Sequence, residues 1–239
     1  MEGQCSGKVV LTTPISKNIL LIRIKLIQPN EISFKAGQYL AVSRPDTDKM
    51  SYYSIASSPN RKTEVELLVQ KGEPGSGSSY MFSLKEGDDV NFKMPMGKAY
   101  LRDNSTHNII FVAGASGASY IRSMIHYLDE TDQINQREIH YFLGCRDEDE
   151  LLESDYMHNL AEKYANFHYY PALSHQEDWG GHTGLVTEIV EQIMPDDMSQ
   201  WEAYSAGSPA MVEAVANMLI NNHKLNGSLF FSDLYSPAS

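Results

Sequence analysis

The sequence of 239 residues predicts two domains: an N-terminal antiparallel six-stranded β-barrel (residues 1–101) and a C-terminal doubly wound parallel-sheet α/β domain (residues 102–239). Three observations support this fold class. Short runs that alternate apolar and polar residues fill the first hundred positions. Continuous apolar runs alternate with helical patterns after residue 108. The charge also changes, from 13 basic and 10 acidic residues in residues 1–100 to 6 and 21 in the rest.

The predicted barrel strands have one inward-facing set of apolar side chains at every second residue. Turn residues such as Pro29-Asn30 and Gly87-Asp88 separate them. A short helix, capped by Ser78 or Ser79, is expected over Tyr80–Leu84 after a flexible Gly75–Gly77 approach. The strands named by this pattern are Leu20–Leu26, Gln38–Arg44, Ser51–Ser57, Thr63–Lys71 and Asp89–Pro95.

The second domain opens with Asn108–Met124, around which the rest of the chain is organised. Ile109–Val112 is a short apolar run, typical of a strand that is covered on both faces. A small-residue turn follows, and then apolar residues at helical spacing. Such a strand, turn and helix direct backbone N–H groups toward one point, which suits a pyrophosphate. The alternative is an ordinary βα turn, because Gly114–Gly117 is not a full GxGxxG fingerprint.

Strands and helices alternate through the remainder of this domain, which predicts a parallel sheet with ligands beyond the carboxyl ends of its strands. Three turns that contain glycine should meet at that edge: Gly114–Gly117, Gly144–Arg146 and Gly207–Pro209. The expected strands are Arg137–Gly144, Asn166–Leu173, Trp201–Ala206 and Ser228–Leu234, and the expected helices are Glu148–Tyr164, Gly184–Met194 and Pro209–Asn222.

Composition excludes several classes of function. The net charge is −12 without basic clusters, which argues against nucleic-acid binding. The chain has no apolar run long enough for a membrane span and no signal-peptide pattern at its start, so we expect a cytoplasmic protein. Cys5 and Cys145 are the only cysteines, which excludes a disulfide framework and a four-cysteine iron–sulfur cluster within this chain.

Other candidate residues carry weaker signals. The eight histidines are scattered along the sequence, so we expect solvated or core-edge histidines and no metal site. The acidic run Asp147–Glu150 fits a helix start better than metal ligation. No GxSxG elbow is present, which disfavours a hydrolase. Phe230, Phe231 and Tyr235 are expected to form a buried final strand, with a tail aromatic near a ligand as the alternative.

Two stretches of the barrel could carry chemistry. Tyr52 and Tyr53 stand beside Ser51 and Ser54, so an aromatic ring and a hydroxyl could meet a flat heterocycle. The alternative is a pair of ordinary core or edge tyrosines. The N–H groups and hydroxyls of Gly75–Ser79 could hold a phosphate, and the alternative is a plain surface loop.

These motifs occur in an order that resembles the ferredoxin–NADP reductase superfamily, and within it the NAD(P)H:flavin reductases. The motifs are Tyr-Ser on a barrel strand, Pro-x-Gly at Pro95, Gly-x-Ser-Gly at Gly114, Gly-x-Arg at Gly144 and Gly-x-Pro-x-Met at Gly207. The passages Met94–Asp103, Asn108–Met124 and Trp179–Val186 are particularly similar, and the resemblance covers nearly the whole chain.

The resemblance implies a role for each matching residue. On the barrel, Tyr53 and Ser54 would be catalytic: Tyr53 lies against the isoalloxazine ring, and Ser54 donates a hydrogen bond near flavin N5, which accepts the hydride. Ser78 and Ser79 match the loop that holds the flavin phosphate. The remaining flavin-binding residues expected from the resemblance are Ser51, Tyr52, Val69, Lys71 and Gly77.

In the second domain the resemblance implies a pyridine-nucleotide site. Arg146 would lie near the adenosine ribose. The pyrophosphate is expected at Gly114, Ala115, Ser116 and Gly117, and the nicotinamide at Gly207, Ser208, Pro209 and Met211. The protein would hold nicotinamide C4 near flavin N5, because the hydride chemistry itself belongs to the cofactors.

Three positions depart from the family pattern. Ser51 stands where the flavin motif usually has Arg, and losing a charge-assisted hydrogen bond of about 1.5–3 kcal/mol would weaken flavin-phosphate binding roughly ten- to a hundredfold. Lys71 or Arg61 are candidate substitutes. Ala206 replaces the cysteine of many relatives, so no thiol assists hydride transfer. Ser116 replaces a frequent Thr and keeps the hydroxyl.

The sequence therefore predicts an oxidoreductase that transfers a hydride from NADH or NADPH to flavin (FAD, FMN or riboflavin) and passes electrons to an external acceptor, for which a protein is one candidate. The missing Arg at Ser51 favours a flavin reductase with exchangeable flavin. One alternative is an FAD-containing reductase subunit of a multicomponent oxygenase or redox complex. Another is a non-catalytic flavin- or nucleotide-binding module. The choice between NADH and NADPH stays open, because Arg146 would attract a 2′-phosphate and Asp147–Glu150 would repel it.

Overall fold

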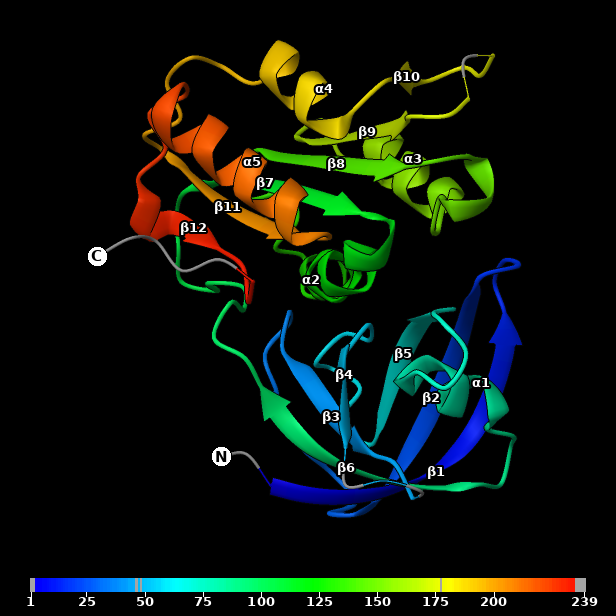
Figure 1. Cartoon of the computed structure of the whole chain (residues 1–239). Helices are drawn as coiled ribbons and strands as arrows, with labels where there is room; N and C mark the ends of the chain where they lie inside the picture. The colour runs from blue at the N-terminus through cyan, green and yellow to red at the C-terminus, as the bar shows by residue number, and fades with distance from the viewer. Residues whose placement is uncertain (1–2, 46, 48, 177, 235–239) are drawn as a thin grey trace. The chain divides into compact units, whose positions relative to one another are not determined.

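The computed structural model describes residues 3–45, 47, 49–176 and 178–234. It divides into two compact units, with the break after Leu101; Arg122–Tyr127, the middle turns of one helix, group with the first unit. The first unit contains an antiparallel six-stranded sheet and the second a parallel six-stranded sheet flanked by helices (Figure 1). The predicted fold class is confirmed.

The strands of the first unit lie in the order β4-β3-β6-β1-β2-β5, and each neighbouring pair is antiparallel. Just beyond β4, the N–H of Ala56 donates to the carbonyl of Glu66 on β5 at 2.8 Å, which brings the two edges of the sheet together as a barrel. Its elements are β1 (Gly3–Pro14), β2 (Ile19–Gln28), β3 (Tyr39–Ser43), β4 (Met50–Ser54), β5 (Glu64–Gln70), α1 (Gly77–Ser83) and β6 (Asp89–Met96).

Strand β1 was absent from the strands that the sequence pattern named. Cys5, Gly7 and Val9 face the barrel interior at every second residue. A Cβ at Gly7 would lie 2.5 Å from the Cγ2 of Ile24 and 2.8 Å from the carbonyl oxygen of Lys25. Because a small thiol and a glycine occupy two of the inward positions, the apolar alternation of β1 is weak in the sequence.

Helix α1 begins three residues earlier than predicted, and Ser76 rather than Ser78 or Ser79 is its N-cap residue. The hydroxyls of Ser78 and Ser79 accept backbone N–H groups of Gly72 and Gly75 instead, at 2.9 and 3.0 Å. These bonds close the loop before the helix, so the capping prediction for the two serines was wrong.

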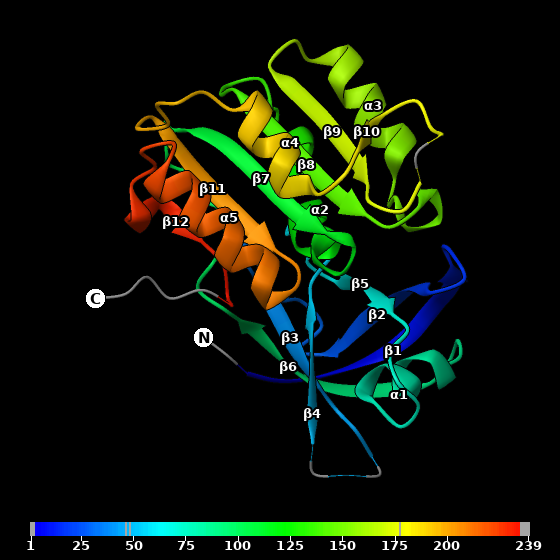
Figure 2. The same ribbon diagram turned by 45° about the horizontal axis from the view of Figure 1, so that its top comes forward.

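The second unit is a parallel sheet in the order β10-β9-β8-β7-β11-β12. Helices α4 and α5 cover one face, and α2 and α3 lie on the other (Figures 1 and 2). The elements are β7 (Asn108–Gly114), α2 (Ala118–Glu130), β8 (Ile139–Cys145), α3 (Ser154–Lys163), β9 (Phe167–Leu173), β10 (His182–Thr183), α4 (Val186–Ile193), β11 (Trp201–Ala206), α5 (Pro209–Asn221) and β12 (Phe230–Phe231).

Two predicted elements of this unit are shorter in the structure. The helix expected over Glu148–Tyr164 is a short 3₁₀ turn at Glu148–Glu150 and then α3, and between them Glu153 has a φ of +50°. The final strand contains only Phe230 and Phe231. Phe230 is buried, Phe231 stacks on Tyr204, and Tyr235 lies outside the described residues.

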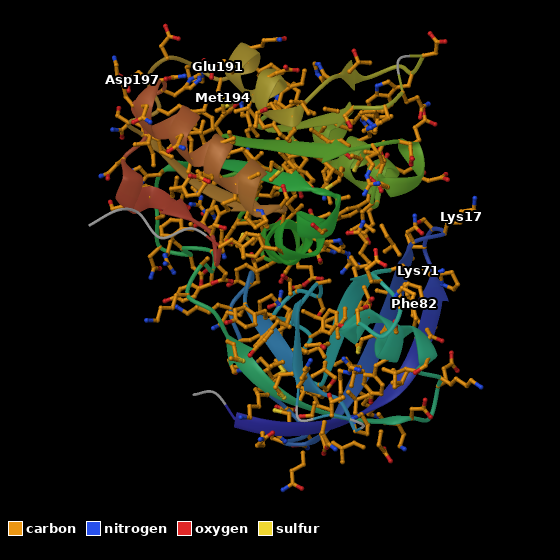
Figure 3. All side chains as sticks on the ribbon, in the orientation of Figure 1. Lys17, Lys71, Phe82, Glu191, Met194 and Asp197 are labelled. Carbon is orange, nitrogen blue, oxygen red and sulfur yellow. The ribbon has the colours of Figure 1, made fainter. Side chains whose placement is uncertain are left out.

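The apolar side chains of α4 and α5 pack with β7, β8 and β11 in one core. Figure 3 labels Met194, which is buried at the end of α4, and Glu191, which lies one turn before it. His223, just after α5, contacts the carboxylate of Glu191 at 3.3 Å and the carbonyl of Pro195 at 2.8 Å. These bonds fix the ends of the two helices beside each other. In the described part of the chain, no helix has the length and apolar character that crossing a bilayer requires.

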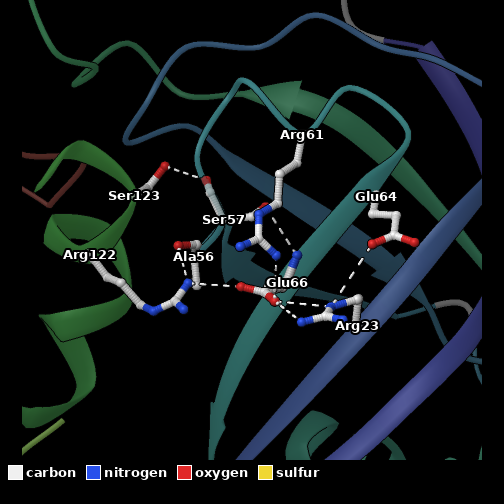
Figure 4. A network of polar contacts seen from close by, with 8 residues as sticks. All are labelled: Arg23, Ala56, Ser57, Arg61, Glu64, Glu66, Arg122 and Ser123. Atoms are coloured by element: carbon white, nitrogen blue, oxygen red, sulfur yellow. Dashed lines mark hydrogen bonds and ion pairs between the residues drawn. The ribbon is translucent and has the colours of Figure 1, made fainter. Parts of the chain in front are cut away.

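A buried ionic network lies within the first unit. Figure 4 shows the carboxylate of Glu66, on β5, surrounded by the guanidinium groups of Arg23, Arg61 and Arg122. The nitrogen–oxygen distances are 2.8, 3.1 and 3.0 Å, and the Glu66 side chain is only 3% exposed. Burial raises the pKa of Glu66, but the nearby charges of Arg122, Arg23 and Arg61 outweigh it and hold that pKa below its usual value. Glu66 is therefore ionised at neutral pH.

The same network fixes the backbone that follows β4. Arg122 also donates to the carbonyl of Ala56 at 2.7 Å, and the hydroxyl of Ser123 donates to the carbonyl of Ser57 at 2.7 Å (Figure 4). The hydroxyl of Ser57 accepts the N–H of Glu66 at 3.1 Å. The segment after β4 is thus held by Arg122 and Ser123 on one side and by Glu66 of β5 on the other.

Candidate functional site

Strand β4 brings together two of the predicted flavin-binding residues and the start of α1. In the ladder, Ser51 pairs with Val42 and Tyr53 pairs with Leu40, so both side chains lie on the same face of the sheet. A Cβ at Gly77 would lie 2.0 Å from the Oγ of Ser51 and 3.2 Å from the hydroxyl of Tyr53. Only a glycine permits this close approach of the loop to the strand.

The Tyr53 hydroxyl is half-buried and shares a hydrogen bond with Ser51. Burial raises the pKa of this phenol above its usual value, against the opposing effects of that hydrogen bond and of the positive charge of Arg44. Tyr53 is therefore a neutral phenol at pH 7, able to donate a hydrogen bond as well as to pack.

Arg44 is a cation near this cluster that the sequence analysis did not select. It follows β3 directly, two residues after Val42, so its side chain projects to the face that carries Ser51 and Tyr53. Its charge is felt at the Tyr53 hydroxyl. In the sequence, Arg44 continues the two-residue alternation of β3 beyond the end of that strand. This position identifies the side chains near Arg44 only once the β3–β4 register is known.

The loop between β5 and α1 is organised by its own serines. Besides the bonds to Gly72 and Gly75, the hydroxyls of Ser76 and Ser78 lie 2.8 Å apart, and Ser79 donates to the carbonyl of Glu73 at 3.3 Å. The two predicted phosphate-binding serines thus already have partners inside the loop. Their hydroxyls shape it, and its remaining backbone N–H groups are the donors that a phosphate would meet.

Tyr52 and Ser54 lie on the opposite face of β4 from Tyr53. Tyr52 is 63% exposed and meets Tyr39 edge-on, with ring centroids 5.9 Å apart. Ser54 pairs with Tyr39 in the ladder and is half-buried. Since β4 is an edge strand, one ligand can contact both predicted catalytic residues, Tyr53 and Ser54, only by lying along that edge.

In the second unit the three predicted glycine turns meet at one edge of the parallel sheet. Gly114 pairs with Gly144 in the ladder. A Cβ at Gly207 would lie 3.1 Å from the backbone nitrogen of Gly114. After β7 the chain makes one 3₁₀ turn over Ala115–Gly117 and continues into α2. The first N–H groups of a helix have no partners within it, so this edge offers donors to an anion.

Within this turn Ser116 and Gly117 have different environments. Ser116 is exposed, so its hydroxyl is open to a ligand. Gly117 is buried, and a Cβ there would lie 2.0 Å from the carbonyl oxygen of Ala206. The need for glycine at position 117 thus comes from packing against the end of β11.

The last turn, after β11, is built for close packing and helix capping. The side chain of Ser208 caps α5 by accepting the N–H of Met211 at 3.3 Å, and Pro209 occupies the first turn of the helix. The sulfur of Met211 would lie 3.4 Å from a Cβ at Gly114. These predicted nicotinamide-side residues therefore shape the turn, with Met211 on the surface shared by Gly114 and Gly207.

Arg146 extends from the end of β8 into solvent. Its side chain is 70% exposed and lies 3.9 Å from the carboxylate of Glu150. The same carboxylate accepts the N–H of Arg146 at 3.0 Å. The acidic run therefore folds back on Arg146. The carboxylate of Glu150 lies beside the guanidinium group that would have to bind a 2′-phosphate.

Comparison with known proteins agrees with this arrangement. Residues 6–100 match the family model of the oxidoreductase FAD-binding domain, and residues 111–217 match that of the oxidoreductase NAD-binding domain. The chain belongs to the ferredoxin–NADP reductase superfamily. The flavin and pyridine-nucleotide cofactors predicted from the sequence are thereby confirmed.

Several members of the superfamily align over nearly the whole chain. The reductase component DmpP of phenol 2-monooxygenase from Pseudomonas sp. (strain CF600) is 33% identical over 97% of this chain and 66% of its own length. The NAD(P)H-flavin reductase of Aliivibrio fischeri is 29% identical over 96% of this chain and 97% of its own. Among solved structures, the Amycolatopsis cytochrome P450 reductase GcoB has a TM-score of 0.86 at 21% identity and covers 100% of this chain and 71% of its own.

The chain spans just under two thirds of DmpP and 63% of the phenol hydroxylase P5 protein of Acinetobacter pittii (strain PHEA-2), to which it is 34% identical over 95% of its own length. The flavin reductase of Aliivibrio fischeri, in contrast, is matched over almost its full length.

Three further residues named from the superfamily pattern have the following environments in the structure. Val69 is 1% exposed and lies in the barrel core, so its side chain does not line an open site. Arg61 contacts Glu66 at 3.1 Å, which commits it to the buried network. Lys71 is exposed after β5, and its N–H donates to Asn18 in the turn that carries Lys17 (Figure 3).

Proposed function

We propose that this protein is an NAD(P)H-dependent flavin reductase that uses flavin as an exchangeable substrate. The observation that carries the proposal is the pairing of one FAD-binding and one NAD-binding oxidoreductase domain in one chain, with serine at position 51 where the flavin motif usually has arginine. When bound, flavin accepts the hydride of the reduced nicotinamide.

The barrel residues fit a flavin. The hydroxyls of Ser51 and Tyr53, the N–H groups of the Gly77 loop and the charge of Arg44 form a donor set suited to a ribityl chain or a phosphate. Ser54, on the other face of the edge strand, is the donor proposed for the hydride-accepting end of the ring. The absence of an arginine at position 51 supports exchangeable binding, because a charge-assisted bond is missing.

In the second unit, Ala115, Ser116 and the first N–H groups before α2 are proposed to hold the pyrophosphate. Gly114, Gly207 and Met211 form the surface proposed for the nicotinamide. Arg146 is proposed to lie near the adenosine ribose. Because the carboxylate of Glu150 lies 3.9 Å from Arg146, we propose a preference for NADH over NADPH.

A second candidate function is the reductase subunit of a multicomponent oxygenase, with tightly bound FAD and a partner protein as electron acceptor. The 33% identity to the reductase component DmpP favours it. The serine loop before α1, which is closed by its own hydrogen bonds, also favours it, because a preformed loop loses less entropy on binding a phosphate.

We also propose a cytoplasmic location for the protein. Cys5 and Cys145 are free thiols, which supports this location.

One experiment separates the two candidates. The purified and dialysed protein is titrated anaerobically with NADH and with NADPH, and flavin absorbance is followed with and without added riboflavin, FMN or FAD. A colourless protein that oxidises NADH only after flavin is added supports the flavin reductase. A yellow protein that NADH bleaches directly supports the reductase subunit. Nucleotide binding without oxidation in any mixture would contradict both and indicate a non-catalytic module.

A further inference from the structure

The parallel sheet brings together two histidines and a glutamate that are separated in the sequence. His140 on β8 and His168 on β9 are direct partners in the ladder, with ring centroids 4.6 Å apart. The Oε1 of Glu138, immediately before β8, lies 3.2 Å from the Nε2 of His140 and 2.6 Å from the Nε2 of His168. Two of the histidines that are scattered along the sequence therefore lie side by side in the structure.

The three side chains converge on one point. One ligand atom of each residue lies within 4.8 Å of the other two. Metal-to-nitrogen and metal-to-oxygen bonds are about 2.0–2.2 Å long in proteins, so a single ion between these atoms needs only small side-chain movements. Glu138 and His168 supply that freedom, since their side chains are 38% and 35% exposed.

His140, in contrast, is held in place by aromatic rings. Phe142, Tyr170 and Trp201 surround it, with ring centroids 6.3, 5.6 and 5.3 Å away. A ligand whose orientation is fixed by packing loses little conformational entropy when it binds.

We propose that Glu138, His140 and His168 form a binding site for a divalent transition-metal ion of the zinc class. Two imidazoles and one carboxylate are a ligand set that proteins use for Zn²⁺ with a position left for water. Mg²⁺ and Ca²⁺ prefer oxygen ligands, so two imidazole nitrogens disfavour the binding of either ion at this site. The proposal is independent of the proposed oxidoreductase activity.

The site lies at the opposite end of β8 from the nucleotide turns. Gly144 lies four positions after His140, about 13 Å away at the rise of a parallel strand. Metal binding should therefore stabilise the second unit and leave NADH binding unchanged. Among the described residues, the buried Nδ1 of His140 has no hydrogen-bond partner. Because such a partner usually strengthens a histidine ligand ten- to a hundredfold, we expect micromolar rather than nanomolar affinity.

The test is calorimetric titration of the chelator-treated chain with Zn²⁺, together with thermal unfolding with and without Zn²⁺. We expect one ion per chain and a higher Tm in its presence. His168→Gln and Glu138→Gln should each weaken binding at least about tenfold. His158→Gln is the matched control, because this exposed histidine on α3 packs on Tyr169 and should bind Zn²⁺ like the parent.

The variants are first checked for metal-free thermal unfolding and NADH binding equal to the parent, which shows that they fold. Zn²⁺ binding that persists unchanged in both His168→Gln and Glu138→Gln would place the ion elsewhere, for example at a thiol, and would overturn the proposal. Failure of the parent chain to bind one Zn²⁺ would overturn it as well. A blue Co²⁺ complex that is lost in both variants would confirm the ligand set.

Discussion

The two units hold their binding residues in different ways. In the parallel sheet, the glycine turns follow neighbouring strands, so the hydrogen-bonded ladder places them together: Gly114 beside Gly144, and Ala113 beside Ala206. In the barrel, Ser51 and Tyr53 on β4 meet Gly77 of α1 through close packing of side chains against a loop. One site is set by backbone topology and the other by side-chain contacts.

This difference predicts where each unit is vulnerable. The site of the parallel sheet, which is set by backbone topology, should tolerate most changes of side chain. It should lose stability or binding where a new Cβ would clash with the backbone. A site built on side-chain contacts depends on the groups that fix its strands, and the buried Glu66 network is one of these. Substitutions of the two kinds therefore test the contrast directly.

The largest effect is expected for Glu66→Gln in the barrel. Removing one partner of a buried ion pair leaves uncompensated charge and costs about 3–5 kcal/mol, here on Arg23, Arg61 and Arg122. The measurement is urea unfolding at pH 7. Glu64→Gln is the matched control, because Glu64 lies 3.9 Å from Arg23 but is one third exposed, and it should cost less than about 1 kcal/mol. Equal losses would mean that burial of the network is unimportant.

The stability of the parent chain and that of Glu66→Gln should also depend differently on pH. Because the pKa of Glu66 is lower in the folded chain than in the unfolded one, its ionisation stabilises the fold above the unfolded value of about 4.3. That contribution disappears as the pH falls through the lowered folded value. The stability difference between the parent and Glu66→Gln should therefore shrink as the pH falls below about 4.3. A difference that stays constant down to pH 3 would contradict the assignment.

In the parallel sheet the corresponding variant is Gly117→Ala. The added Cβ would lie 2.0 Å from the carbonyl oxygen of Ala206, so β11 or the turn must shift, at a cost of about 1–3 kcal/mol. Gly180→Ala is the matched control, since a Cβ there meets nothing within 4 Å. Gly117→Ala should lower both the free energy of unfolding and the affinity for NADH, and Gly180→Ala should change neither. Unchanged stability with weaker NADH binding would instead mean that Gly117 faces the ligand.

The contrast also explains what could be predicted from the sequence. The strand–turn–helix pattern at Asn108–Met124 and the convergence of three turns follow from topology alone, so local patterns were sufficient. Strand β1 was missed because Cys5 and Gly7 weaken its alternation. The placement of Arg44 and the meeting of His140 with His168 depend on register between strands. A single sequence does not encode register locally.

A smaller effect is expected for Ser54→Ala, which tests the proposed hydroxyl at the hydride-accepting atom. Loss of one hydrogen bond of about 0.5–1.5 kcal/mol predicts a decrease in kcat of up to about tenfold, with little change in the KM for NADH. Ser43→Ala on the neighbouring strand is the control, because its hydroxyl contacts Met50. Stopped-flow reduction of added flavin measures kcat and the KM for NADH in both variants. A raised KM with unchanged kcat would assign Ser54 to nucleotide binding instead.

The smallest effect is expected for Arg44→Gln, which tests whether this residue replaces the missing arginine of the flavin motif. A charge near the Tyr53 hydroxyl contributes about 1 kcal/mol to binding a phosphate in a solvated site. The Kd for FMN should therefore rise about fivefold, while that for riboflavin, which has no phosphate, stays constant. Added salt should reduce the difference, because it screens exposed charges. Lys25→Gln, on a strand that is not a neighbour of β3 or β4, is the control for net charge. Equal weakening of FMN and riboflavin would show that Arg44 supports the strand rather than the phosphate, and the contrast between the two units would then rest on packing alone.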